Sequence, residues 1–411
     1  MFSGSVICFI VGYQSGLSGL IYPAAFLAVL PITALLLVRL RRRRLEVVRT
    51  FSPRAVSAGS VAQVTLAVRN LSASSSGSAT WVDNLPWAPG TAGPGTLPAL
   101  LGSLPGRVPK GASTAMRYSV RPPARGIFRI GPLDVEYFDP FSLASGSSSL
   151  GGIQSLSVIP AYVPLGEGGP TILAGDGSAR LVQRRTSGSD DDLMTREYRS
   201  GDALRRVHWR ATARHGELMV RQEEPRTYPE ARLLIDTRGA GYPDGWAELG
   251  GSDSGSGSFE WAVRMLASLG VHLHKAGFLV QILETGPAQV SPLGDANGAT
   301  GSELSFLVSL AGIHRTSAAQ QPQGVAAEDR PENLPGPIFA IVSEPEPATL
   351  SWIIAQRRPF ELAIAFVIGR RSSVTFTTLA DAGWTCVPIR ETDDPALAWA
   401  SIPRFSAGAT Q

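Results

Sequence analysis

The sequence predicts a chain of mixed class, α/β plus all-β, in three structured parts: an N-terminal transmembrane helix or hairpin, a β-sandwich-like domain, and a Rossmann-like domain with a parallel sheet. Three observations support this. The first 38 residues carry no charge, and an arginine-rich run follows them. Short stretches with the two-residue period of strands come next. Strand patterns then alternate with helical patterns, which is typical of a parallel sheet covered on both faces.

The composition excludes several classes of protein. Of the 411 residues, 44% are hydrophobic and 17% are charged, which is enough apolar material for ordered cores and argues against a disordered chain. The formal net charge is +3, too near zero for a dedicated nucleic-acid binder. Two cysteines are too few for a zinc cluster or a disulfide framework.

The membrane segment lies within residues 1–44. Leu17–Val38 comprises 22 residues, enough for a helix to cross a hydrocarbon core of about 30 Å. A shorter apolar stretch, Phe2–Tyr13, precedes it, and Gln14–Gly16 is suited to a tight turn. One membrane helix and a helical hairpin therefore both remain open.

Orientation follows from the basic residues around the apolar run. No Lys or Arg precedes it, whereas six arginines follow, at positions 39, 41, 42, 43, 44 and 49. Basic flanks stay on the cytoplasmic side of a membrane. We therefore expect a cell-membrane protein whose residues 45–411 face the cytoplasm.

Residues 45–165 are predicted to form the β-sandwich-like domain. Val64, Leu66 and Val68 alternate with more polar residues, as in a strand with one buried face. Residues 125–133 are expected to form a strand, a turn and a second strand, and Asp139–Phe141 a turn. Further strands are predicted at residues 81–85, 116–120 and 155–159.

Residues 228–405 are predicted to form the Rossmann-like domain. An apolar strand, Ala231–Ile235, ends at Asp236, and the helical pattern Phe259–Lys275 follows. The alternation continues with strands at 278–283, 337–342, 362–368 and 384–389 and helices at 304–313, 348–357 and 374–382.

Residues 166–227 form a linker that ends in an unusual charged segment. Residues 196–224 hold seven arginines and five acidic residues. Asp202 is expected to cap a helix beginning at Ala203, and His215-Gly216 to end it. The arginines could line a site for an anionic ligand or partner, or form an arginine–carboxylate lattice that joins the domains. The near match of charges favours the lattice, with the rings of Tyr198 and Trp209 buried.

This segment resembles the signature of the domain of unknown function 58 (DUF58) family. The matching residues are Arg196, Tyr198, Gly201, Asp202, Arg205, Val207, His208, Trp209 and Arg214. Arg125–Pro132 and Asp139–Phe141 are similar to two further motifs of that family. The resemblance implies a C-terminal domain similar to von Willebrand factor type A domains. It also implies two partners, a MoxR-type AAA+ ATPase and a transglutaminase-like membrane protein, and no established activity.

Catalytic and metal sites are not expected. Type A domains bind a cation through Asp-x-Ser-x-Ser, but the matching residues here, Asp236–Ala240, lack both serines and include Arg238, whose charge opposes a cation. His208 could act as a general base oriented by Asp202 or Glu197. No Gly-x-Ser-x-Gly motif or phosphate-binding loop accompanies it, so we assign no catalytic residue and no cofactor.

Two hypotheses on function remain. The first is a membrane-anchored cytosolic module that binds other proteins, and no nucleic acid. The second is a hydrolase or transferase that acts on an anionic substrate through His208, Asp202 and the neighbouring arginines. The missing nucleophile and nucleotide motifs favour the first.

Overall fold

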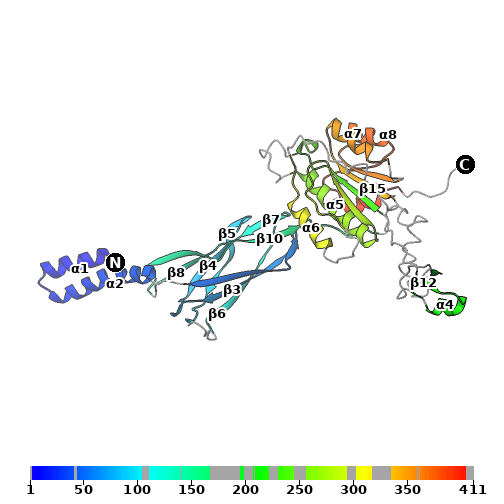
Figure 1. Ribbon diagram of the computed structural model, residues 1–411. Coiled ribbons are helices and arrows are strands. Elements are labelled where there is room, and N and C mark those ends of the chain that lie inside the picture. Colours follow the sequence, from blue (N-terminus) through cyan, green and yellow to red (C-terminus); the bar gives the residue numbers. More distant parts are fainter. Residues whose placement is uncertain are drawn as a thin grey trace. The chain divides into compact units, whose positions relative to one another are not determined.

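The computed structural model divides the chain into two compact units, Met1–Ala161 and Tyr162–Gln411 (Figure 1). The structure describes residues 2–40, 44–103, 111–139, 141–166, 195–198, 207, 209–221, 230–244, 256–293, 302–316, 335–358, 360 and 362–403.

The first unit begins with two helices joined by a short 3-10 turn. They form a hairpin, since the Ser5 hydroxyl in the first helix donates a hydrogen bond of 2.7 Å to the carbonyl of Ala24 in the second. The elements are α1 (Phe2–Gln14), η1 (Ser18–Leu20) and α2 (Ile21–Leu40). Of the two arrangements left open by the sequence, the structure therefore has the hairpin.

Two glycines shape this hairpin. Gly16 has a φ of +65°, the left-handed conformation that the turn requires. A Cβ atom on Gly12 would lie 3.0 Å from the Cβ of Leu20, so glycine permits the close approach of the chain after the turn. Gly16 thus serves the turn and Gly12 the packing behind it.

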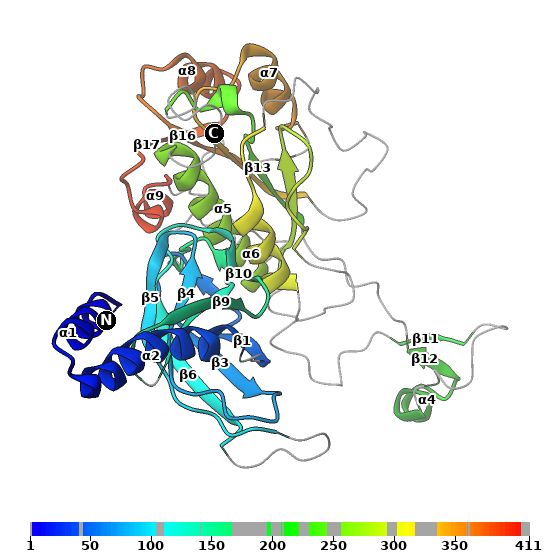
Figure 2. The same cartoon turned by 90° about the vertical axis from the view of Figure 1, so that its left-hand side faces the viewer.

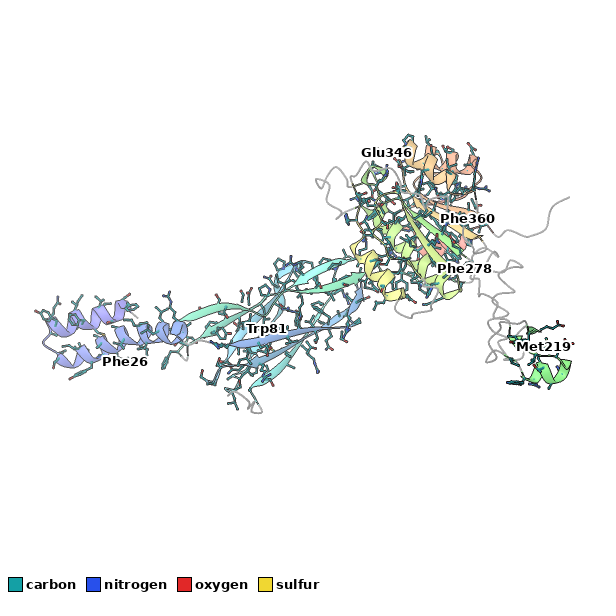
Figure 3. The ribbon with its side chains drawn as sticks, in the orientation of Figure 1. Phe26, Trp81, Met219, Phe278, Glu346 and Phe360 are labelled. Atoms are coloured by element: carbon teal, nitrogen blue, oxygen red, sulfur yellow. The ribbon has the colours of Figure 1, made fainter. Side chains whose placement is uncertain are left out.

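The second helix of the hairpin meets the length requirement for a membrane span. Ser18–Leu36 has a mean hydropathy of 2.0 and is 11% buried, so by length and composition it is able to cross a bilayer. The large apolar side chains of α1 and α2, such as Phe26, project outward (Figure 3).

Ten strands build the β-rich domain in three sheets. Their orders are β1-β3-β6, β5-β4-β8-β9 and β2-β10-β7. All pairs are antiparallel except β2 with β10. The strands are β1 (Leu45–Ser52), β2 (Ala55–Ser57), β3 (Ala62–Asn70), β4 (Ala79–Leu85), β5 (Ala88–Leu97), β6 (Ser113–Val120), β7 (Gly126–Ile130), β8 (Leu133–Phe138), β9 (Ser145–Leu150) and β10 (Gln154–Ile159).

One core holds the three sheets together. Val64, Leu66 and Val68 of β3 point inward, as their alternation predicts, and pack with Trp81 of β4 (Figure 3). The sequence-based prediction missed β1, β2, β5 and β9. β5 and β9 are rich in Gly, Pro or Ser and lack the apolar alternation on which the prediction depended.

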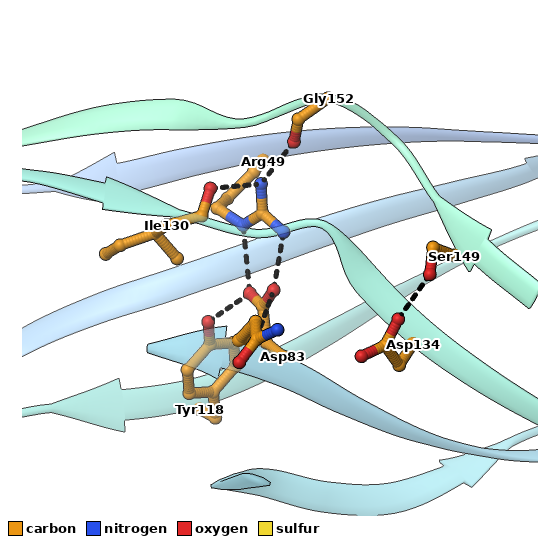
Figure 4. Close-up of polar contacts among 8 residues, drawn as sticks. Arg49, Asp83, Tyr118, Ile130, Asp134, Ser149 and Gly152 are labelled. Carbon is orange, nitrogen blue, oxygen red and sulfur yellow. Dashed lines mark hydrogen bonds and ion pairs between the residues drawn. The ribbon is translucent and has the colours of Figure 1, made fainter. Parts of the chain in front are cut away.

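A buried ion pair lies inside this domain (Figure 4). The Arg49 guanidinium on β1 makes two hydrogen bonds to the Asp83 carboxylate on β4, of 2.9 Å from Nε and 2.6 Å from Nη2. Its Nη1 also donates to the carbonyl oxygens of Ile130 and Gly152, at 3.3 and 3.1 Å. The Tyr118 hydroxyl donates a short hydrogen bond to the same carboxylate. Every charged group in the cluster is therefore paired.

Tyr118 keeps its proton in this environment. Burial, followed by the hydrogen bond to Asp83 and the negative charge of that carboxylate, raises the pKa of Tyr118 above its ordinary value. The phenol therefore acts as a donor to Asp83 at physiological pH.

Arg49 does not take part in the basic flank of the membrane segment. Its side chain is only 4% exposed and belongs to the sandwich core, so counting it among the juxtamembrane arginines was wrong. The other five arginines of that count remain, of which Arg39 and Arg44 are described and exposed. Without Arg49, the positive charge still lies only on the C-terminal side of the apolar run.

Arg49 also explains why glycine occupies position 131, before Pro132. Gly131 has a φ of +101°, and a Cβ atom there would lie 2.9 Å from both Nη atoms of Arg49. Only glycine fits a left-handed conformation against the guanidinium. The Arg125–Pro132 motif is thus a structural feature that closes around the ion pair.

The second unit contains a five-stranded parallel sheet of order β14-β13-β15-β16-β17. The strands are β13 (Glu230–Ile235), β14 (Leu279–Glu284), β15 (Pro335–Val342), β16 (Ala363–Ile368) and β17 (Thr385–Ile389), and the helices are α5 (Gly257–Lys275), α6 (Ser302–Gly312), α7 (Pro347–Ala355), α8 (Val374–Asp381) and α9 (Pro395–Ala400). The order is doubly wound, with its reversal between β13 and β15. The predicted Rossmann-like alternation is confirmed, and α9 is an addition to it.

Helices cover both faces of the sheet (Figure 2). On one face, Leu350 and Ile353 of α7 and Leu379 of α8 pack on alternate strand residues such as Ala340 and Ala365. On the other face, Trp261 of α5 lies against Phe366 and Trp399 of α9 against Phe339, with ring centroids 6.3 and 5.8 Å apart. The strands are buried on both sides, as their apolar runs predict.

The buried ion pair generates the first prediction. Asp83→Ala should leave the Arg49 guanidinium buried without its counter-ion and lower the free energy of unfolding of the β-rich domain by about 3–5 kcal/mol. Hydrogen exchange of the β1 and β4 amides in the full chain measures this loss for that domain alone. Glu46→Gln, at an exposed position on β1, is the matched control and should change the value by less than about 0.5 kcal/mol. Equal protection in both variants would contradict the prediction.

Candidate functional site

The predicted signature segment forms two short paired strands with a helix between them in sequence. β11 (Thr195–Glu197) pairs with β12 (Met219–Arg221) in antiparallel register, and α4 (Trp209–His215) lies between them in sequence. Two hydrogen bonds tie the piece together: the amide of Tyr198 donates to the carbonyl of Leu218 at 2.8 Å, and the amide of Met219 to the Thr212 hydroxyl at 3.0 Å.

The helix of this segment begins later than the sequence predicts. Val207 forms an antiparallel bridge with Val220, so it is extended, and α4 begins at Trp209 rather than at Ala203. Val is a poor helix former and fits a strand partner well, so the β-hairpin prevails over the helix at this point. The predicted end of the helix is confirmed, because Gly216 has a φ of +81°.

The predicted signature residues have different outcomes. Arg196 lies on β11 opposite Val220, Tyr198 is half-buried, and Arg214 is exposed on α4. Trp209, at the start of α4, is 70% exposed, so the expectation that its ring is buried was wrong; the buried side chains of this segment include Val207 and Val220. Gly201, Asp202, Arg205 and His208 lie outside the described residues, so their predicted roles stay predictions.

A second candidate site lies at the carboxyl edge of the parallel sheet. Doubly wound sheets bind ligands at this edge, where the strand order reverses. Here the reversal lies between β13, which ends before Asp236, and β15, which ends before Ser343. Asp236, Thr237 and Ser343 are all buried at this point.

Asp236 is held by its own chain. Its Oδ1 accepts hydrogen bonds from the Thr285 hydroxyl at 2.5 Å and from the amide of Arg238 at 3.0 Å. The Tyr242 hydroxyl donates to the backbone carbonyl of Asp236 at 2.9 Å. The 3-10 turn η4 (Gly239–Gly241) closes over the carboxylate, since a Cβ atom on Gly241 would lie 2.1 Å from Oδ2.

Among the described residues, the carboxyl of Asp236 has one oxygen without a hydrogen-bond partner. Its side chain is fully buried, and the unpaired atom is Oδ2. Burial raises the pKa of Asp236, and the hydrogen bonds from Thr285 and Arg238 only partly oppose that rise. The protonated form of Asp236 is therefore favoured relative to an exposed aspartate.

The residues around Asp236 do not fit a divalent cation. A cation site needs several oxygen ligands, but Oδ1 is already occupied by two donors. The Arg238 guanidinium donates to the carbonyl of Thr285 at 3.2 Å and lies 3.8 Å from the Glu346 carboxylate, which places positive charge beside Asp236. Within the described part of the chain, no group of three His, Cys, Asp or Glu residues is placed to hold a metal.

An open pocket of about 790 Å³ adjoins the loop that closes over Asp236. Charged side chains from the ends of β15, β16 and β17 line it, together with residues before α5 and α9. The cations are Arg370, Arg371 and Arg390, and the acids include Asp244, Glu344, Glu391 and Asp393. The sequence-based prediction missed these residues, although polar residues directly after apolar parallel strands were the available signal.

Cys386 is not a reactive thiol. It lies half-buried on β17, where burial raises its pKa to about 11. A thiol with that pKa is protonated at neutral pH and is a poor nucleophile.

The buried carboxyl of Asp236 generates the second prediction. Because its pKa is raised on folding, the folded state binds this proton more tightly, and the free energy of unfolding should fall as pH rises from about 4 towards the folded pKa. The side chain of Asp236→Asn cannot ionise, so the variant does not lose stability as pH rises. Its amide oxygen can still accept the hydrogen bonds from Thr285 and Arg238. The variant should therefore melt above the wild type at pH 8, and the difference should shrink at pH 4.

Thermal unfolding of the full chain at the two pH values measures this effect. Asp381→Asn, at an exposed position on α8, is the control and should melt like the wild type at both. A variant at position 236 that melts below the wild type at pH 8 would show that the ionised carboxylate stabilises the fold.

Solved structures show only weak similarity to this chain. The CARDB domain of a protein from Pyrococcus furiosus, solved in complex with di-metal ions, is 14% identical with a TM-score of 0.20, over 29% of this chain and 93% of that chain. A cycloisomaltooligosaccharide glucanotransferase from Paenibacillus sp., complexed with cycloisomaltoheptaose, is 12% identical with a TM-score of 0.19, over 84% of this chain and 53% of that chain. Scores this low carry no argument about function.

No curated protein matches the sequence. A family match does exist, and it covers the signature segment and the loop after Asp236. It runs from the residue before β11 through α4, β12 and β13 to the end of η4. The signature segment and the closed loop after Asp236 thus lie in one continuous stretch, residues 194–241, that matches the family described as Protein of unknown function DUF58.

Proposed function

We propose that the chain is a membrane-anchored protein-interaction module of the DUF58 family that acts with a MoxR-type AAA+ ATPase. In this proposal the hairpin is the anchor, the C-terminal domain is von Willebrand factor type A-like, and residues 45–411 face the cytoplasm. The observation that carries the proposal is the closure of the ligand-binding edge of the parallel sheet around Asp236.

That closure argues against a small-molecule site at the strand reversal. Asp236 is fully buried, its Oδ1 is occupied by Thr285, and Gly241 seals the other side. A substrate or cofactor at this point would have to displace the chain's own hydrogen bonds. The domain keeps the architecture of a binding fold but fills the usual site with its own residues.

The exposed charged residues around the adjoining pocket, called the rim below, favour the binding of a protein partner. Arg370, Arg371 and Arg390 are exposed beside exposed Glu344 and Glu391. Mixed charges on an open surface suit the polar contacts of a transient protein interface better than the recognition of a phosphate, which a cluster of cations alone would favour. The nature of the partner rests on the family resemblance, which also suggests a transglutaminase-like membrane protein.

The alternative is a hydrolase or transferase that acts on an anionic substrate through His208, Asp202 and the arginines around them. The observation that favours it is the exposed surface of α4, where Trp209 and Arg214 are accessible beside His208 in sequence. A loss of cellular function in His208→Ala, with unchanged melting temperature and unchanged partner capture, would favour this alternative.

The third prediction concerns the rim. The full chain, purified in detergent from its own cells, should retain a MoxR-type ATPase, and the Arg370→Glu/Arg371→Glu variant should lose most of it because the surface charge is reversed. Mass spectrometry of the retained proteins measures the loss. Lys275→Glu is the control, since it lies at the opposite end of α5 from the rim and is exposed. Equal capture by both variants, or no ATPase with the wild type, would contradict the proposal.

The fourth prediction concerns orientation. Arginines flank only the C-terminal side of the apolar run, so the C-terminus should lie in the cytoplasm. Alkaline phosphatase fused there should be inactive, because it matures only outside the cytoplasm, where disulfides form. Green fluorescent protein at the same position is the control and should fluoresce. An active phosphatase would reverse the topology.

A further inference from the structure

Four exposed apolar side chains gather at one end of the β-rich domain. They are Leu71, Leu101, Phe138 and Phe141, with exposed fractions of 47, 53, 42 and 63%. Each lies in a loop or at a strand end rather than on a sheet face. Exposed apolar side chains that cluster, unlike scattered ones, mark sites of interaction with proteins or membranes.

This end of the domain is the one from which the hairpin emerges. Arg44, just before β1, is bonded to the loop after β3: its amide donates to the Ser72 hydroxyl at 2.9 Å, and its carbonyl accepts from the amide of Leu71 at 2.7 Å. The amide of Ser103 donates to the carbonyl of Ser72 at 2.8 Å, which brings the loop of Leu101 to the same place.

The β8–β9 hairpin reaches the same end. Gly146 on β9 pairs with Tyr137, next to Phe138, and a Cβ atom on Gly146 would lie 2.6 Å from Cγ1 of Val38 in α2. The turn that carries Phe141 therefore lies beside the last turns of the membrane-length helix. Figures 1 and 2 show the β8–β9 end of the domain next to α2.

Asp139 fixes the conformation of this turn. It is buried, and its carboxylate accepts hydrogen bonds from the amides of Phe141, Leu143 and Ala144 at 2.9, 2.6 and 2.7 Å. The buried carboxylate of Asp139 thus accepts from the backbone amides of the turn, while the Phe141 side chain is exposed.

The chain is too short here to hold the domain away from the bilayer. Only residues 41–44 separate Leu40 at the end of α2 from Leu45 at the start of β1. Five Cα–Cα steps reach at most about 18 Å even when fully extended, so the start of β1 stays within about that distance of the end of α2.

We infer that Leu71, Leu101, Phe138 and Phe141 form a lipid-contacting surface that inserts into the interface of the bilayer spanned by α2. Anionic headgroups match the exposed Arg39 and Arg44 beside it. This inference rests on the proposed membrane anchoring. The other interface has its own aromatic pair, since Tyr13 and Tyr22 are 82 and 79% exposed on either side of the hairpin turn.

The spacing between these two belts agrees with a bilayer. Tyr22 and Arg39 lie on one continuous helix, 17 residues apart. At about 1.5 Å per residue this is about 26 Å, close to the hydrocarbon thickness of about 30 Å.

The fifth prediction tests this surface by the depth of spin labels. The full chain, with Cys8 and Cys386 replaced by alanine, receives one nitroxide label at Phe141→Cys or at Leu101→Cys. It is reconstituted into nanodiscs of phosphatidylglycerol and phosphatidylcholine. Collision with oxygen, which concentrates in lipid, is then compared with collision with a water-soluble nickel complex.

Two further labels serve as controls. Val29→Cys reports the exposed side of α2, and Val61→Cys reports an exposed position just before β3, at the far end of that strand from Asn70 and Leu71. Labels at 141 and 101 should give an oxygen-to-nickel ratio several-fold above that at 61 and below that at 29. Since the two positions lie in separate loops, local misfolding of one leaves the other as a test.

The outcomes separate this inference from the proposal on which it rests. Labels at 141 and 101 that match the one at 61, while 29 is in lipid, would overturn the lipid-contacting surface and leave the anchor intact. A label at 29 that is open to the nickel complex would overturn the membrane anchoring itself.

Discussion

The β-rich domain depends on the pairing of one buried cation with one buried anion. The Arg49 guanidinium links β1 to Asp83 on β4, to the end of β7 at Ile130 and to the loop at Gly152, so a single side chain contacts all three sheets. Tyr118 adds β6 through the same carboxylate. A buried pair of this kind adds little net stability over an apolar core, but the loss of either partner is costly. Its role is therefore to hold the sheets in one arrangement, with the left-handed Gly131 shaped to admit the guanidinium.

The parallel-sheet domain also buries an aspartate, but with different partners. Asp236 is as deeply buried as Asp83, but its partners are a hydroxyl and a backbone amide instead of a guanidinium, and one oxygen stays unpaired. Burial raises the pKa of Asp236, and the two hydrogen bonds and the nearby Arg238 charge only partly oppose that rise. The same residue type therefore forms an ion pair in one domain and has a raised pKa in the other. This difference is why an acid after the first strand is not by itself a metal or catalytic site.

The sequence predicted the parts of the fold that depend on periodic apolar residues. The parallel sheet and the buried face of β3 follow from such patterns. β5 and β9 could not be predicted, since Gly, Pro and Ser residues in them form strands only because β4 and β8 offer hydrogen bonds. The start of α4 was misplaced because Asp202 is a good cap in isolation, whereas the pairing of Val207 with Val220 is a tertiary contact. The rim of Arg370, Arg371 and Arg390 exists only once the ends of β16 and β17 are side by side.

The arginines show most clearly what the sequence alone could not predict, because the role of each depends on burial that no local pattern encodes. In the sequence Arg49 and Arg44 look alike, yet one is an internal partner of Asp83 and the other lies exposed at the end of the anchor. Arg238 lies beside a buried acid to which its backbone amide donates, while its guanidinium donates to the Thr285 carbonyl. Arg370 and Arg371 remain on the surface. A formal charge of +3 averages over all these roles. The charges available to a membrane or a partner are those that the two cores have not enclosed, and only the folded arrangement separates them.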